Sequence, residues 1–320
     1  MEKAWARRPA TALARLAGRP LLLVSARDLL IAAEEEGVLL VSLLAPVPAA
    51  SAGFARAARD AGAPLLLARP SGAAEEKGPE EARDDAAFVE AAVRAADELH
   101  FRNPIALLKE PPRAGSAVPE AERIQREIDA GFTGVALATT PQSAPAARDA
   151  ALVASNVCQL ELGLEIVPLG GSGQLAADLV RQLKSRGAAP SALRLAEPDQ
   201  ALAAELLPVA TSTTDESAPE HLMERGVRQL VAAGPFLRAL QQAAPRELWE
   251  RLQGWADEHG ASLEQAAARH HRVVRTLPPA EEEKLEALCC YEAQELYGRA
   301  AAAKTAPRLL NRLAALAQKE

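Results

Sequence analysis

The chain has 320 residues, of which 49% are hydrophobic and only 3% are aromatic, so its core must be built mainly from Leu, Val and Ala. A formal net charge of -7 and a scatter of Lys and Arg argue against nucleic acid or an anionic membrane as the main partner. The three cysteines show no metal-ligand spacing, and no apolar run can span a bilayer or form a signal-peptide core, so the sequence predicts a soluble cytoplasmic protein.

Short apolar runs alternate with helical patterns along most of the chain. Residues 3–17 are typical of an alanine-rich amphipathic helix, and Ser25 can cap a second helix that ends at Gly37. The apolar runs are nearly continuous, as in a parallel sheet covered on both faces, and the segments between them are long enough for parallel crossovers. We predict strands over 38–44, 64–69, 104–109, 134–138, 163–168, 192–195, 207–210 and 227–231, with helices over 52–61, 84–100, 118–129, 144–161, 173–186, 199–205 and 217–225.

Eight strand–helix units favour a closed (β/α)8 TIM barrel over an open doubly wound sheet. The predicted fold class is therefore α/β, with an N-terminal helix before the barrel and a helical extension after it. We divide the chain into N-terminal helices packing on the barrel (1–36), the barrel itself (37–245) and a C-terminal helical extension (246–320). This extension either covers the barrel or mediates assembly, and its helices are predicted over 247–259, 263–271, 280–297 and 307–318.

The third predicted strand ends in Lys109 and Glu110, and Pro111-Pro112 then stops it. In TIM barrels, chemistry is presented at the C-terminal ends of the strands. Adjacent strand residues point to opposite faces, so we expect one of these charges at the barrel mouth and the other outward in a salt bridge. The alternative is a catalytic pair, in which a desolvated Lys109 forms a Schiff base and Glu110 moves protons.

Further polar residues are predicted near the same mouth. Glu165 lies within the fifth strand and needs a partner there; Arg194 or Lys109 can supply it, and a Glu165–Arg194 ion pair at the mouth is our preferred interpretation. The segment Gly170-Gly171-Ser172-Gly173 precedes a helix, so its N–H groups can hold a phosphate or simply form the turn into that helix. The hydroxyl-rich loop Thr211-Ser212-Thr213-Thr214 can help to bind such an anion.

The order of five segments between residues 20 and 245 is informative about the family that the chain resembles. They read VSARDLLIAAEEEG over 24–37, APLLL over 63–67, DAGFTGV over 129–135, LEIVPLGG over 164–171 and ERGVRQL over 224–230. Together they resemble the class II (metal-dependent) fructose- or tagatose-bisphosphate aldolase family. The resemblance implies a barrel enzyme that splits ketose bisphosphates with a divalent metal.

The histidine ligands implied by the resemblance are missing from this chain. That family ends its third strand in His-x-Asp-His, where the Asp is the acid/base and the second His binds the metal. The matching positions here are Leu108, Lys109, Glu110 and Pro111, so that only Glu110 retains a carboxylate. Because no histidine ligand is retained, we expect no catalytic metal and no cofactor. In this resemblance the strand-one Asn falls at Leu44, the strand-four Asp at Ala138, and the two other metal-binding His positions at 197–199 and at Val209 or Ala210. Two phosphate-binding elements of the family are altered here, to the sequences over 211–214 and 231–235.

The predicted function is therefore that of a non-catalytic homologue, or pseudoenzyme, which acts as a scaffold or binds a partner. The family offers a precedent, since its tagatose-bisphosphate members include an accessory, non-catalytic subunit. We expect a second copy or another protein to bind through the C-terminal helices, a sugar phosphate as a further ligand, and no nucleic acid or membrane. The first alternative is a metal-free aldehyde-lyase for ketose phosphates that uses Lys109; the second is a sugar-phosphate sensor in carbohydrate metabolism.

Overall fold

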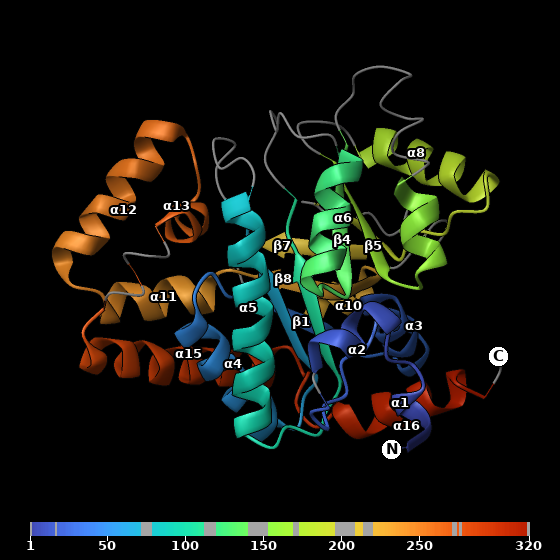
Figure 1. The fold of residues 1–320 in the computed structure, drawn as a ribbon, viewed down its shortest axis with the longest axis horizontal. Helices are drawn as coiled ribbons and strands as arrows, with labels where there is room; N and C mark the ends of the chain where they lie inside the picture. Colours follow the sequence, from blue (N-terminus) through green and yellow to red (C-terminus); the bar gives the residue numbers. More distant parts are fainter. Residues whose placement is uncertain are drawn as a thin grey trace.

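The computed structural model describes residues 2–16, 18–71, 79–111, 120–139, 153–168, 173–195, 209–213, 220–270, 274 and 277–318. Its eight parallel strands follow one another in sequence order and close into a barrel (Figure 1). This confirms the closed barrel over the open sheet. The strands are β1 (Leu40–Leu44), β2 (Leu65–Arg69), β3 (Ile105–Lys109), β4 (Gly134–Thr139), β5 (Gly163–Pro168), β6 (Ala192–Arg194), β7 (Val209–Thr213) and β8 (Val227–Ala232).

Helices connect the strands on the outside of the barrel. Residues 153–159 are helical between β4 and β5, while 144–152 and the predicted helix over 199–205 lie outside the described residues. The helices that alternate with the strands are α3 (Ala26–Glu36), α4 (Pro48–Ala61), α5 (Pro79–Glu98), α6 (Glu120–Ala130), α8 (Gly173–Ser185), α10 (Glu220–Glu224) and α11 (Gly234–Ala243).

The single N-terminal helix predicted over 3–17 is wrong. Two short helices, α1 (Glu2–Trp5) and α2 (Ala10–Leu16), take its place. Pro9 lies between them, and a proline ring lacks the N–H and crowds the preceding turn that a continuous helix needs. The carbonyl of Pro9 instead accepts from the N–H of Ala12 at 3.0 Å and so begins the second helix.

Strand alternation separates two apolar cores. In β3, Ile105 and Leu107 pack with Phe88 of α5 in the layer between barrel and helices. Ala106 and Leu108 belong to a second cluster, whose strand members, here called the inner cluster, come from β1, β2, β3, β6, β7 and β8. Side chains on alternate strand positions point to opposite faces, so the inner cluster fills the barrel interior. Its members are Leu40, Leu44, Leu66, Ala68, Ala106, Leu108, Ala192, Ala210 and Val231.

The first turn of α3 closes one end of the barrel. Ser25 caps this helix by accepting from the N–H of Arg27 at 3.1 Å. A Cβ added to Gly134 or Gly163, the first residues of β4 and β5, would lie 2.7 or 2.6 Å from the Cβ of Ala26. Only glycine therefore lets α3 approach so closely. The barrel mouth lies at the opposite end, where the strands finish.

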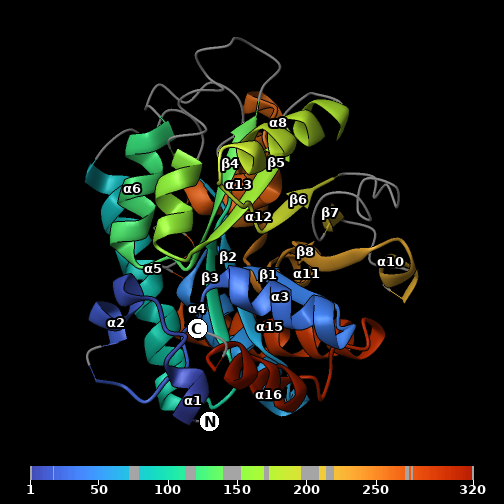
Figure 2. The same ribbon diagram turned by 90° about the vertical axis from the view of Figure 1, so that its right-hand side faces the viewer.

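Further helices follow α11 in the described part of the chain. They are α12 (Arg246–His259), α13 (Leu263–Arg269), α15 (Pro279–Arg299) and α16 (Ala306–Leu316). α15 runs against α4 and α11, and α16 lies beside α1 and α3 near the closed end (Figure 2). Within the described part of the chain, no helix combines the length and apolar character needed to cross a membrane.

The contact between α4 and α15 depends on Gly53. A Cβ at this position would lie 2.3 Å from the carbonyl oxygen of Glu286 and 2.9 Å from the Cβ of Cys289. Cys289 and its neighbour Cys290 are free and buried in this region, and burial raises the pKa of the Cys289 thiol. These thiols therefore pack rather than react.

Tyr297 of α15 carries an unpartnered hydroxyl. Its side chain is 1% exposed, and its Oη has no hydrogen-bond partner among the described residues. Phenylalanine keeps the ring and removes the buried polar atom, so we expect Tyr297→Phe to raise the free energy of unfolding by about 1 kcal/mol. Tyr291 on the same helix is 58% exposed, and Tyr291→Phe should change nothing. Urea denaturation of both variants measures the difference; a loss of stability in Tyr297→Phe would contradict the prediction.

Candidate functional site

Three charged side chains meet at the barrel mouth, and we call them the mouth network: Glu110, Glu165 and Arg194. Arg194 donates from Nε to Glu165 Oε1 at 2.9 Å and from Nη2 to Glu110 Oε1 at 2.9 Å. Two further hydrogen bonds run from Nη1 to Glu110 Oε2 and from Nη2 to Glu165 Oε2. The guanidinium thus holds both oxygens of each carboxylate.

Strand register explains why the mouth network forms. Glu165 of β5 lies opposite Ala192 of β6, and Ala192 belongs to the inner cluster. Arg194 is two residues further along β6, so it points to the same inner face and toward the mouth. Glu110 directly follows the last residue of β3, two residues after the inward Leu108. The preferred Glu165–Arg194 pairing is present, and Glu110 joins it from across the barrel.

The mouth network carries more negative than positive charge. One guanidinium faces two carboxylates, and all three side chains are largely buried. Burial raises the pKa of Glu165, Arg194 lowers it, and the charge of Glu110 raises it again, with a net shift upward. Burial also disfavours the charge of Arg194, but the two carboxylates outweigh it and raise the pKa of the guanidinium. Glu165 therefore takes up a proton more readily than an exposed glutamate does.

Lys109 lies on the other face of β3 from Glu110. Its Nζ is 2.7 Å from Oδ1 of Asp85 on α5, and its side chain is 1% exposed. Arg69, which is opposite Lys109 in the β2–β3 register, forms an ion pair with the same carboxylate. Lys109 therefore lies between the barrel and α5, outside the barrel interior. This position is unfavourable for a Schiff base with a substrate that enters through the mouth.

The predicted anion site is described only in part. Gly170, Gly171 and Ser172 lie outside the described residues, and Gly173 is the first residue of α8. The predicted loop over 211–214 is wrong for its first three residues, which complete β7. Thr211 is buried, and its Oγ1 donates to the carbonyl of Leu195 at 2.9 Å, while Ser212 pairs with Val231 of β8. Threonine is branched at Cβ and therefore suits a β-strand. The many hydroxyl side chains of this segment had instead indicated a loop.

Sequence reasoning missed a second buried arginine near the mouth. The pairing of β3 with β4 ends at Lys109 and Val135. Pro111, two residues after Lys109, has no N–H to donate. Beyond that point, the carbonyl of Ala136 accepts from Nη2 of Arg123 on α6 at 2.8 Å. Glu120 and Glu127 on the same helix neutralise Arg123. The signal was present as opposite charges at i,i+3 and i,i+4 spacing on a helix.

The described mouth residues do not fit a divalent metal. Leu108 and Pro111, to which the sequence resemblance assigns histidines, have no side-chain ligand atom, and Glu110 is bound to Arg194. No group of three or more His, Cys, Asp or Glu residues is gathered as a metal site in the described part of the chain. A catalytic zinc site needs about three protein ligands. Residues 197–199 lie outside the described residues.

Comparison with solved structures supports the barrel fold. Neither a protein-family model nor a curated protein sequence matches this chain. Its structure is similar to the YdjI aldolase from Escherichia coli K12, with a TM-score of 0.62 and 12% identity over 89% of this chain and 100% of that one. It is also similar to the fructose-bisphosphate aldolase from Campylobacter jejuni, with a TM-score of 0.61 and 10% identity over 89% of this chain and 97% of that one. At these identities the likeness shows the fold alone, a closed (β/α)8 barrel that this chain shares with those aldolases.

Proposed function

We propose that this chain is a non-catalytic aldolase-type barrel that serves in the cytoplasm as a scaffold or protein-binding subunit. The mouth network is the observation that carries the proposal. Glu110 holds the position that the resemblance assigns to the acid/base carboxylate, and both of its oxygens accept from Arg194. It must leave the guanidinium before it can take a proton from a substrate. The lack of ligand atoms at Leu108 and Pro111 supports the same conclusion.

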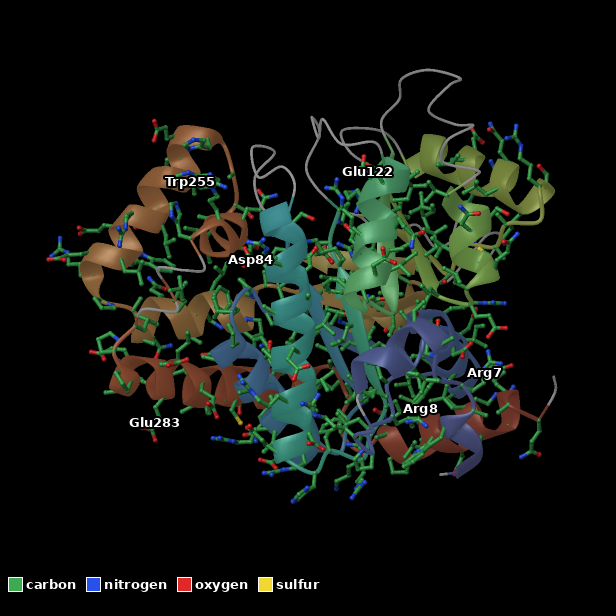
Figure 3. All side chains as sticks on the ribbon, in the orientation of Figure 1. Arg7, Arg8, Asp84, Glu122, Trp255 and Glu283 are labelled. Atoms are coloured by element: carbon green, nitrogen blue, oxygen red, sulfur yellow. The ribbon has the colours of Figure 1, made fainter. Side chains whose placement is uncertain are left out.

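We assign partner binding to the helices α12 and α13. The helices α15 and α16 are engaged with α4 and α3, whereas α12 and α13 pack mainly on each other and stand to one side of the barrel (Figure 1). Trp255 of α12 is partly buried, stacks on His259 with a centroid separation of 4.4 Å, meets His270 edge-on at 5.6 Å, and lies in the part of the molecule away from the barrel in Figure 3. Tryptophan is enriched at the energetic centres of protein interfaces.

An assay of the purified full-length protein tests the absence of catalysis. We expect no cleavage of fructose or tagatose bisphosphate above the protein-free control, with or without added Zn²⁺ or Co²⁺, and substoichiometric metal by mass spectrometry. Metal-dependent cleavage that is lost in Glu110→Gln would overturn the proposal.

Borohydride trapping tests the metal-free lyase as a separate alternative. Because Lys109 Nζ is buried against Asp85, we expect no reduced adduct on Lys109 after incubation with ketose phosphates or keto acids. Peptide mass spectrometry reads the result, and Lys109→Met is the matched control. An adduct at Lys109 that is missing from this control would replace the scaffold proposal with Schiff-base chemistry.

A further inference from the structure

We propose that Arg194 is a binding site for a small carboxylate ligand and that Glu110 occupies this site as a built-in competitor. The ligand would be a monoanionic organic acid, and it would bind where the Glu110 carboxylate now lies. The inference goes beyond the scaffold function and does not require it, because a barrel with or without catalysis can hold such a ligand.

The guanidinium of Arg194 has a fixed orientation. Glu165 accepts from Nε and Nη2 of Arg194, which holds the guanidinium along one edge. Glu165 itself lies within β5, which is paired with β4 and β6 on its two sides, so its backbone cannot shift independently. The other edge of the guanidinium, formed by Nη1 and Nη2, faces Glu110. A planar fork held in this way is preorganised to bind a carboxylate through two parallel hydrogen bonds.

The two carboxylates of the mouth network differ in their exposure and in their positions on the strands. Glu165 has an 8% exposed side chain inside the barrel, whereas Glu110 follows the end of β3 and has a 14% exposed side chain. The backbone of Glu110 is fixed, since its N–H donates to the carbonyl of Arg69 at 2.9 Å and its carbonyl accepts from Ser71 Oγ. A rotation about its side-chain bonds is therefore enough for Glu110 to release Arg194 toward the mouth.

The charge balance of the mouth network favours a monoanionic ligand. The buried network already holds one more negative than positive group when both carboxylates are ionised. A monocarboxylate that replaces Glu110 leaves this balance within the network unchanged. A phosphate dianion would add a further negative charge beside Glu165, whose raised pKa already reflects burial together with the charge of Glu110. The site therefore favours a carboxylate over a phosphate.

The test compares acetate binding by the full-length wild type, Glu110→Ala and Glu110→Gln at pH 7 and constant ionic strength. Removing the competitor frees the fork, so Glu110→Ala should bind acetate at least about ten-fold more tightly than the wild type, as measured by calorimetry and thermal shift. Glu110→Gln, a weaker competitor of the same size, should fall between them. In the double variant Glu110→Ala/Arg194→Met, acetate binding should be lost.

Several results would overturn the inference. One is equal acetate affinity in the wild type and Glu110→Ala. A second is the absence of binding by the folded Glu110→Ala, or, if that variant does not fold, the absence of any gain in Glu110→Gln. Binding that survives Arg194→Met would place the ligand elsewhere. Inorganic phosphate that binds with the same dependence on Glu110 at pH 8, where it is mainly the dianion, would refute the carboxylate class. None of these outcomes depends on the aldolase assay, so the two proposals fail separately.

Discussion

Arg194→Met is expected to lower the free energy of unfolding by about 3–5 kcal/mol at neutral pH, because it leaves two buried carboxylates without their shared cation. Glu110 and Glu165 both lose their charged donors in this variant, and their charges then face each other. Methionine fills much of the same volume, so the loss would come from electrostatics rather than from a cavity. Urea denaturation followed by circular dichroism at pH 7 measures the effect.

The same variant should recover stability as the pH falls. The pKa of Glu165 is raised in the folded wild type, so this residue favours folding at pH values below its unfolded pKa, and that contribution is lost as the pH rises through the folded value. Without Arg194, the influence that lowers this pKa is removed, and the folded protein binds a proton still more tightly. Arg194→Met should therefore lower the free energy of unfolding by less at pH 5 than at pH 7.

A triple variant provides the control for the mouth network. Arg194→Met/Glu110→Gln/Glu165→Gln removes the cation and both charges together, and it should regain most of the stability that the single variant loses. A loss of under about 1 kcal/mol in the single variant, or a loss that is independent of pH, would contradict the picture of a buried, desolvated network.

Gly53→Ala is expected to lower the free energy of unfolding by about 3 kcal/mol, at the upper end of the usual cost of overpacking. Alanine is the better helix former by about 1 kcal/mol, so the sign of the effect is decided by packing alone. The new Cβ would lie 2.3 Å from Glu286 O and 3.1 Å from the backbone nitrogen of Cys290, and backbone atoms of α15 cannot move aside cheaply. The two helices must separate along their contact.

Gly254 offers a matched control for Gly53. It lies inside α12, and a Cβ there would meet nothing within 4 Å. Gly254→Ala should therefore stabilise the protein by up to about 1 kcal/mol. Thermal or urea denaturation of both variants gives the comparison. Equal effects of the two substitutions would mean that α4 and α15 do not approach each other as closely as described.

The strands were predictable because a strand that is buried on both faces has a continuous apolar sequence. β5 was predicted with its observed bounds, and the other strand predictions overlap the observed strands. The exceptions follow local chemistry. Pro9 breaks the first helix, which the alanine-rich pattern around it masked, and Thr211 extends β7 although its hydroxyl suggested a loop.

The site was less predictable, because contacts across a barrel join residues that are far apart in sequence. Glu165 and Arg194 could be paired because they lie on adjacent strands with inward positions. Glu110 is 84 positions from Arg194 and reaches it across the mouth, so no local pattern indicated that contact. Asp85 was also missed, because the partner of Lys109 is set by how α5 lies on β2 and β3.

The docking of α16 has a consequence for the order in which the protein folds. Arg308 of α16 donates to the carbonyl of Glu36 at the end of α3, and the two residues are 272 positions apart. α16 also lies beside α1, so the first and last helices cover the same end of the barrel (Figure 2). α16 therefore follows α3 late in synthesis, and the apolar face of α3 that packs with Leu309 and Leu313 is exposed to aggregation until α16 emerges. Because α1 and α16 lie side by side, we expect a circular permutant in which α16 precedes α1 through a linker to cover this surface earlier in synthesis.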